Sequence, residues 1–181
     1  RQLEAAAESL LLAHSFEQGQ QRAGVAIDLG NLAVLRGQVD EARGFYDEAI
    51  RLAAGDQQII FSARLNRARL AATDARLVEL DQLSAAIAQM PDSPSKTRWQ
   101  INLGQQYRLA GAGGLERAYG QLASARSAAA AQDPALLAEA LDSLAQLYED
   151  QGRIDDSLRL TRQGLAAAAG APAGMLGDRL V

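Results

Sequence analysis

The chain has 181 residues, a formal net charge of −4, and 48% hydrophobic but only 4% aromatic residues. This composition supports a folded core, while the negative charge argues against general nucleic-acid binding, which depends on neutralising phosphates. There is no cysteine, so disulfides and thiolate metal sites are excluded. No apolar run reaches the ~18 to 20 residues that span a bilayer, and no signal peptide is visible, so we expect no membrane partner and, by default, a cytoplasmic location. Because the sequence begins with Arg1, we expect a fragment or a processed product, and a removed signal peptide stays open.

The first part of the chain is predicted to form three helices, over residues 1–15, 22–36 and 40–54. Between the first two, the polar stretch from Glu17 to Gln21 is predicted to be a connector. Gly37 is expected to end the second helix, and the carboxylate of Asp40 favours the start of the third. A lone helix followed by a helical pair is therefore expected at this end.

Three further helical pairs are predicted, over residues 58–90, 94–131 and 134–169. Thr73 or Asp74 can cap the second helix of the first of these pairs. Ser93-Pro94 and Asp133-Pro134 each combine a capping residue with proline at the first helical position. The tail, residues 170–181, has too little periodicity for an assignment. Because no strand pattern occurs anywhere, the expected fold class is all-α.

Similar residues recur at a fixed spacing along the chain. Leu29-Gly30 returns as Leu103-Gly104, two steps of 37 residues later, and as Leu144-Ala145 after one further step of 41. A period of this size indicates a solenoid of helical pairs, each of which buries its apolar face against its neighbours. The repeat therefore points to binding rather than to chemistry.

The segment LGNLAVLRGQVDEARGFYDEAI resembles the tetratricopeptide repeat through Leu29, Gly30, Gly37, Ala42, Tyr46 and Ala49. The match returns through Leu103, Gly104, Tyr107, Ala118, Leu122 and Ala125, and more weakly where Ser157 and Thr161 replace alanine and an aromatic residue. The pair at 58–90 is degenerate, because Arg67 stands where leucine is expected. The resemblance implies one domain over residues 1–181, a right-handed superhelix (α-solenoid) of about four helical hairpins (22–54, 58–90, 94–131, 134–169) with an N-terminal helix at 1–15.

In this family the first helix of each pair lines a concave groove that holds partner peptides, so the resemblance implies a protein–protein interaction scaffold. The positions that align with the groove, and that we expect to contact a protein or peptide partner, are Asn31, Asn66, Arg69, Arg98, Asn102, Gln105, Arg108 and Gln146. Amides can bond to a peptide backbone of any sequence, and arginines can hold a carboxylate by two bonds. Arg69, Arg98 and Arg108 are expected to form a basic centre, and Glu139, Asp142 and Glu149 an acidic end. The alternative is that these side chains form the solvated faces of amphipathic helices.

A narrower resemblance covers the second half of the chain. The run from LGQQY to LTRQGLAAAAG looks like the repeat region of bacterial proteins with a caspase-like CHAT protease domain, and like those of large bacterial transcription regulators. This resemblance implies an alternative role, the sensor or regulatory arm of a multidomain protein. A third option is self-association through exposed solenoid ends, such as the N-terminal helix with Leu3, Leu10 and Leu11.

The remaining candidate sites favour structural roles, and we expect neither catalysis nor a cofactor. His14 is the only histidine and the chain has no cysteine, so we expect neither a histidine-based metal site nor a catalytic triad. The GAGG segment at 111–114 lacks the Lys-Ser/Thr of a phosphate loop and is predicted to be an inter-helix turn. Trp99 is interpreted either as a binding anchor or as a gap filler. The acids Glu149, Asp150, Asp155 and Asp156 are interpreted as a hydrated turn, because they lack the order of a calcium loop.

Overall fold

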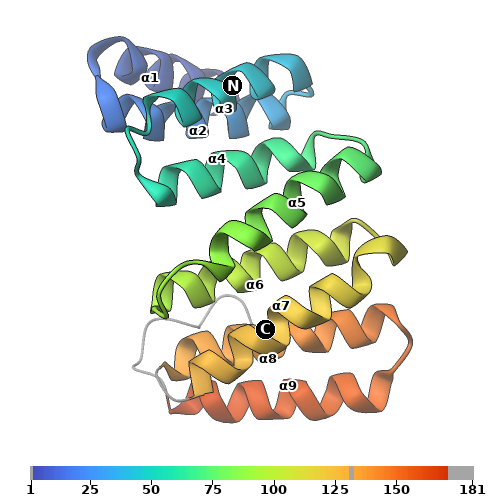
Figure 1. The fold of residues 1–181 in the computed structure, drawn as a ribbon. Coiled ribbons are helices and arrows are strands. Elements are labelled where there is room, and N and C mark those ends of the chain that lie inside the picture. Colours follow the sequence, from blue (N-terminus) through green and yellow to red (C-terminus); the bar gives the residue numbers. More distant parts are fainter. Residues whose placement is uncertain (1, 131–132, 171–181) are drawn as a thin grey trace. The chain divides into compact units, whose positions relative to one another are not determined.

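The computed structural model describes residues 2–130 and 133–170 of the chain, and these residues form α-helices joined by short turns (Figure 1). No strand occurs within the described ranges, which confirms the predicted all-α class. By its internal contacts the chain divides into two compact units, residues 1–79 and 80–181. The prediction of a single domain with four repeats stays a prediction, and the two units are described separately.

Unit 1 contains four helices and the beginning of a fifth. They are α1 (Gln2–Phe16), α2 (Gly19–Leu35), α3 (Val39–Leu52), α4 (Gln57–Arg69) and the first turns of α5 (Thr73–Ala88). Helices α2 and α3 form an antiparallel hairpin, α1 packs against α2, and α4 packs against both α2 and α3. Each helix thus covers the apolar side of its neighbour, as expected for stacked helical pairs.

The connector before α2 is shorter than the sequence predicts. The prediction of a connector from Glu17 to Gln21 is wrong beyond Gln18, because α2 already begins at Gly19. Glutamine and arginine are good helix formers, so a polar stretch extends the helix wherever one of its faces can pack. Ala23, which follows this stretch, is completely buried.

The core of unit 1 consists mainly of small side chains. Ala26, Ala33, Ala42, Ala49 and Ala63 surround one large residue, Tyr46, which is only 1% exposed. Gly30 allows this close approach, because a Cβ atom at that position would lie 2.4 Å from Cε1 of the Tyr46 ring. Gly30 therefore lies where α2 and α3 pack closely.

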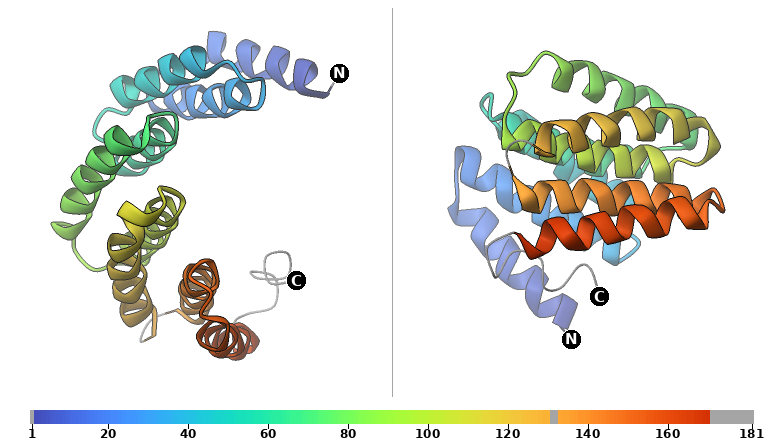
Figure 2. Two further views of the ribbon diagram at one scale, coloured as in Figure 1. Left: turned by 90° about the vertical axis from the view of Figure 1, so that its right-hand side faces the viewer. Right: turned by 90° about the horizontal axis from the view of Figure 1, so that it is seen from below.

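Within its described residues, unit 2 contains the rest of α5 and four further α-helices. They are α6 (Pro94–Leu109), α7 (Leu115–Ala130), α8 (Pro134–Asp150) and α9 (Ile154–Ala169), with a short 3-10 helix, η1 (Ala112–Gly114), between α6 and α7. Helices α8 and α9 form an extensive hairpin and lie side by side in both views of Figure 2. Large apolar side chains such as Ile101, Leu122 and Leu147 are completely buried here.

Local sequence signals account for several helix ends. The Ser93 side chain accepts a bond from Lys96 N (3.1 Å), and Asp133 Oδ1 accepts one from Ala135 N (2.9 Å), each with proline next in the chain. Both predicted cap-and-proline signals are confirmed. Asp56 caps α4 in the same way, by accepting a bond from Gln58 N (2.9 Å), although the sequence had not been interpreted as a cap there.

The glycine-rich segment 111–114 is the inter-helix turn that the sequence predicts. It contains η1 and connects α6 to α7. Gly114 is buried against the backbone of α6, where a Cβ atom would lie 2.1 Å from the carbonyl oxygen of Tyr107. The glycine at this position is therefore required by the close approach of two backbones.

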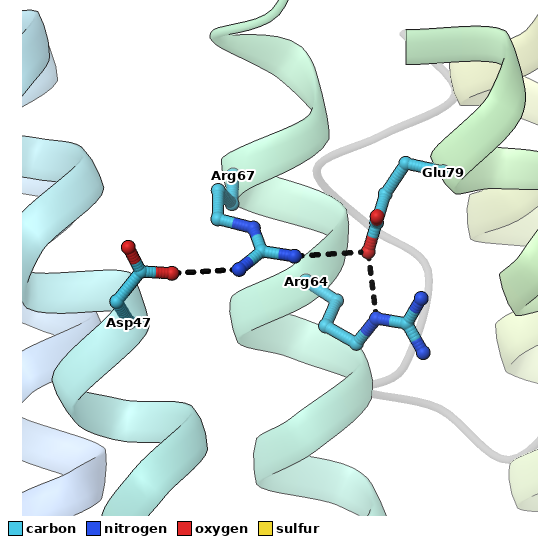
Figure 3. A network of polar contacts seen from close by, with 4 residues as sticks. All are labelled: Asp47, Arg64, Arg67 and Glu79. Carbon is cyan, nitrogen blue, oxygen red and sulfur yellow. Dashed lines mark hydrogen bonds and ion pairs between the residues drawn. The ribbon is translucent and has the colours of Figure 1, made fainter. Parts of the chain in front are cut away.

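Arg67, which departs from the repeat consensus, is a half-buried link between helices (Figure 3). Its guanidinium donates to Asp47 of α3 (2.6 Å) and to Glu79 of α5 (3.3 Å), and Glu79 also accepts from Arg64 of α4 (2.6 Å). Although partial burial lowers it, the pKa of Arg67 is raised overall by the bonds and charges of Asp47 and Glu79. At this position the repeat consensus has a packed leucine. In unit 1 a charged network takes its place and joins α3, α4 and α5.

Candidate functional site

A cavity of about 340 Å³ opens on unit 1 beside the α2–α3 hairpin. Its lining combines two amides, a tyrosine and an arginine with three aliphatic side chains: Asn31, Val34, Leu35, Tyr46, Asn66, Arg69 and Leu70. We call it the Asn31 cavity. The polar residues come from α2, α3 and α4, so the cavity exists only when the third helix has packed on the hairpin.

The polar groups of the Asn31 cavity are organised around one oxygen atom. Asn31 Oδ1 accepts a hydrogen bond from the Tyr46 hydroxyl (2.8 Å) and another from Asn66 Nδ2 (3.0 Å). Both acceptor sites of this carbonyl are thus occupied. No described residue bonds to Asn31 Nδ2, so its two N–H donors remain available to a ligand.

Arg69 gives the Asn31 cavity a positive charge. Its side chain is exposed, and no described carboxylate lies within ion-pair distance of it. Burial raises the pKa of Tyr46, and the charge of Arg69, which lines the same cavity, lowers that pKa in part. Because the net effect is an increase, Tyr46 keeps its proton at neutral pH and acts as a donor.

A second polar group lies on unit 2, between α6 and α8. Arg108 donates to Asp150 (2.6 Å) and to Gln146 (3.1 Å), and Gln146 donates in turn to Asp142 (2.7 Å). Nearby, Gln105 donates to Ser143 (2.9 Å), which is buried. The charge of Arg108 is therefore balanced within the protein, and this arrangement holds α6 against α8.

Asp142 makes the stability of unit 2 dependent on pH. Burial raises its pKa, which the bond from Gln146 and the charge of Arg108 lower in part. A carboxyl group whose pKa is raised on folding stabilises the protein only below that pKa, and the contribution is lost as pH rises through it. Asp142→Asn is therefore expected to stabilise the protein in urea unfolding at about pH 7, with a difference from wild type that shrinks toward about pH 4. Asp150→Asn, which removes the ion pair with Arg108, should have the opposite sign at about pH 7.

The eight predicted partner-contacting residues are distributed over both units. Asn31, Asn66 and Arg69 meet in the Asn31 cavity, and Arg108 and Gln146 meet in the bonded group on unit 2. Gln105 bonds to Ser143, Asn102 is half-buried, and Arg98 is exposed. Their role in partner binding stays a prediction.

The sequence did not identify the hydroxyl of Tyr46 or the counter-ions of Arg108 as parts of a site. The sequence identified Tyr46 only as a residue of the repeat resemblance, yet its hydroxyl donates to Asn31 Oδ1. Asp150 is half exposed, as a hydrated turn implies, but it also pairs with Arg108, and Asp156 pairs with Arg153 and Arg159. Arg153 and Arg159 lie within one helical turn of Asp156, so its ion pairs could have been predicted from the sequence. The partner of Asp150 is 42 residues away, so that pair could not.

His14 has the packing role that the sequence favours. It lies edge-on to Phe45 with 6.2 Å between ring centroids, and its Nε2 is 3.2 Å from Glu48 Oε1 of α3. Glu48 also pairs with Arg22 (3.0 Å). Within residues 2–130 and 133–170, no three His, Cys, Asp or Glu side chains are grouped so that they could hold a metal ion.

Two other expectations concern the ends of the chain. Helix α1 leaves large apolar side chains exposed, among them Leu11 (52%), Leu12 (61%) and Phe16 (77%), and self-association through it stays a prediction. The tail, for which the sequence supports no assignment, lies outside the described residues from position 171 onward. None of the described helices is long and apolar enough to cross a bilayer.

Stacked antiparallel helical pairs define the chain as an all-α helical-repeat protein. No family model matches the sequence, and no curated protein matches it. Among solved structures, the chain is similar to the assembly chaperone of RpL4, Acl4 (residues 1–338), with 16% sequence identity and a TM-score of 0.47. The similarity covers 97% of this chain and 72% of the Acl4 chain.

Proposed function

We propose that this protein is a scaffold that binds an acidic segment of a protein or peptide partner in the Asn31 cavity, without catalysis of its own. The observation that carries the proposal is the exposed guanidinium of Arg69 beside the Asn31–Asn66 pair. Because no described carboxylate pairs with this guanidinium, it can hold a carboxylate of a partner through two parallel bonds. The bound segment would thereby neutralise the only arginine that lines the cavity.

The other lining residues suit a peptide. The free donors of Asn31 can bond to a backbone carbonyl, and such bonds do not depend on the peptide's sequence. Leu35, which is 70% exposed, and Val34 provide an apolar wall for a neighbouring aliphatic side chain. The cavity therefore combines a charged anchor, backbone recognition and apolar contact, as peptide sites generally do.

A binding role fits the chemistry of these groups better than a catalytic one. Asparagine amides and the arginine guanidinium do not change their protonation state near neutral pH and so cannot act as acid or base catalysts. Tyr46, the remaining titratable group in the cavity, has a raised pKa and stays protonated. On unit 2 the same proposal assigns Arg98, Asn102 and Gln105 to partner contact, while Arg108 and Gln146 hold α6 to α8.

The proposal predicts a preference for acidic ligands that depends on Arg69. Labelled acidic, neutral and basic peptides of matched length and apolar content would be titrated with the 181-residue chain by fluorescence anisotropy. We expect the acidic peptides to bind most tightly, and Arg69→Glu to weaken that binding by at least about tenfold, because a charge-assisted bond pair becomes a repulsion. Asn66→Ala, which releases Asn31, should weaken it by about threefold.

Arg162→Glu on α9 is the matched control, because Arg162 is exposed and the substitution changes the net charge equally. It should leave the affinity unchanged. If Arg162→Glu weakens binding as much as Arg69→Glu, binding follows net charge and the cavity is not the site. A preference for basic peptides, or no binding by any peptide of the set, would also contradict the proposal. Arg108→Glu is unsuitable, since it would place a carboxylate against Asp150.

A further inference from the structure

Unit 2 carries a second open cavity, of about 370 Å³, which the proposed function does not use. It lies where the turn between α8 and α9 faces the beginning of α7. Its lining consists of Leu115, Glu116, Tyr119, Tyr148, Gln151 and Arg153. We call it the Tyr119 cavity.

Two tyrosine rings form the wall of the Tyr119 cavity. Tyr119 of α7 and Tyr148 of α8 have ring centroids 6.4 Å apart and planes inclined by 50°. Arg153 already places its guanidinium 4.2 Å from the centroid of the Tyr148 ring. Tyr119 is 49% exposed. The cavity thus contains one occupied and one open aromatic surface for a cation.

The charges around the Tyr119 cavity favour a positive ligand. Arg153 is already neutralised, because its Nε donates to Asp156 Oδ2 (2.8 Å), and this bond is the main cause of a lowered pKa of Asp156. Glu116 is exposed and has no cationic partner among the described residues. The carboxylate that remains without a counter-ion in the lining is therefore that of Glu116.

We propose that the Tyr119 cavity binds an arginine side chain of a protein partner. The flat guanidinium would stack on the exposed ring of Tyr119 and bond to the carboxylate of Glu116, while its methylene groups contact Leu115. Guanidinium groups stack on aromatic faces and hydrogen-bond at their edges at the same time, which an ammonium group cannot do. This site lies in unit 2 and does not depend on the acidic ligand proposed for the Asn31 cavity.

The test uses a matched pair of probes. The peptide acetyl-Gly-Arg-Gly-amide and its citrulline analogue, which has nearly the same shape but no charge, would be titrated into the complete chain. Ring resonances of Tyr119 and Tyr148 would be followed by NMR. We expect the arginine peptide to shift both rings with a Kd on the order of millimolar, and the citrulline peptide to bind at least about threefold more weakly.

Two variants test the assigned contacts. Glu116→Gln and Tyr119→Leu should each weaken binding of the arginine peptide by at least about twofold to fivefold, because the first removes the charge at constant size and the second removes the aromatic face. Leucine at position 119 also preserves the apolar packing, so the fold is expected to persist. Glu8→Gln, at an exposed glutamate of α1, and Arg69→Glu should leave this binding unchanged.

Several outcomes would overturn the assignment. Equal binding of the citrulline peptide would show that charge is not recognised. Unchanged binding in Glu116→Gln and Tyr119→Leu, or no shift of either tyrosine ring, would show that the arginine is not held here. Tighter binding of acetyl-Gly-Glu-Gly-amide at these rings would mean that Arg153 recruits an anion instead. Failure in any of these ways leaves the Asn31 cavity proposal untouched, because that cavity is tested with acidic peptides and Arg69→Glu.

Discussion

Gly30→Ala is expected to lower the free energy of unfolding by about 1–3 kcal/mol, although alanine is the better helix former. The new Cβ atom would lie 2.4 Å from Cε1 and 2.9 Å from Cζ of Tyr46. Tyr46 is 1% exposed, so its ring cannot move aside without displacing the alanines packed around it. The same displacement would separate its hydroxyl from Asn31, so the variant should also bind acidic peptides more weakly.

Gly24→Ala provides the comparison for this prediction. Gly24 belongs to the same helix, α2, but a Cβ atom there meets no other atom within 4 Å. This substitution should therefore stabilise the protein by up to about 1 kcal/mol through helix propensity alone. Urea unfolding followed by circular dichroism would give both values, and hydrogen exchange would show whether the loss is centred on α2 and α3. Equal stability of the two alanine variants would mean that Gly30 and Tyr46 are not in close contact.

Glu79→Ala is expected to cost about 1–3 kcal/mol of stability, and Asp47→Ala less than about 1 kcal/mol. Glu79 is 19% exposed and accepts bonds from two arginines of one helix face, Arg64 and Arg67. Without Glu79, the half-buried guanidinium groups of Arg64 and Arg67, which lie one helical turn apart, would repel each other. Asp47 is 48% exposed, so water can replace much of its hydrogen bond and ion pair with Arg67.

A second substitution tests whether an apolar residue can replace the charge that Glu79 neutralises. In the Glu79→Ala background, Arg67→Leu removes one of the two like charges and restores the apolar residue that the repeat consensus has. It should recover a large part of the lost stability, as measured by urea unfolding, because apolar replacements of ion pairs are often neutral or better. If the two single variants, Glu79→Ala and Asp47→Ala, cost the same, the network does not centre on Glu79.

The ends of most helices could be predicted because their signals are local. Ser93-Pro94 and Asp133-Pro134 act within three residues of the helix start, where the capping bond and the proline geometry are both encoded. The start of α2 was missed for the opposite reason. Its first turn is polar, and only the packing of Ala23 against neighbouring helices shows that it is helical.

The candidate site was predictable in its residue types but not in its connections. Aligning the repeats placed Asn31, Asn66 and Arg69 on the first helices of two successive pairs, and the structure has them on α2 and α4. Whether these side chains touch depends on contacts between residues that are far apart in the sequence. The bond from Asn66 to Asn31 joins residues 35 positions apart. Whether an arginine is available depends on such contacts too, since Arg108 is neutralised by Asp150, whereas no described carboxylate pairs with Arg69.

The sequence by itself determined that this protein is all-α and built of paired helices. The signals for this are the helical spacing of apolar residues, the capping residues and the small residues where helices pack closely, and each of them extends over only one or two helical turns. Only the tertiary structure decided which polar side chains are available for binding. Hydrogen bonds and ion pairs form between atoms brought within about 3 Å, and the helices that supply them are far apart along the chain. For this reason Arg67 became part of an internal network and Tyr119 an open aromatic surface, although neither role can be inferred from its sequence neighbours.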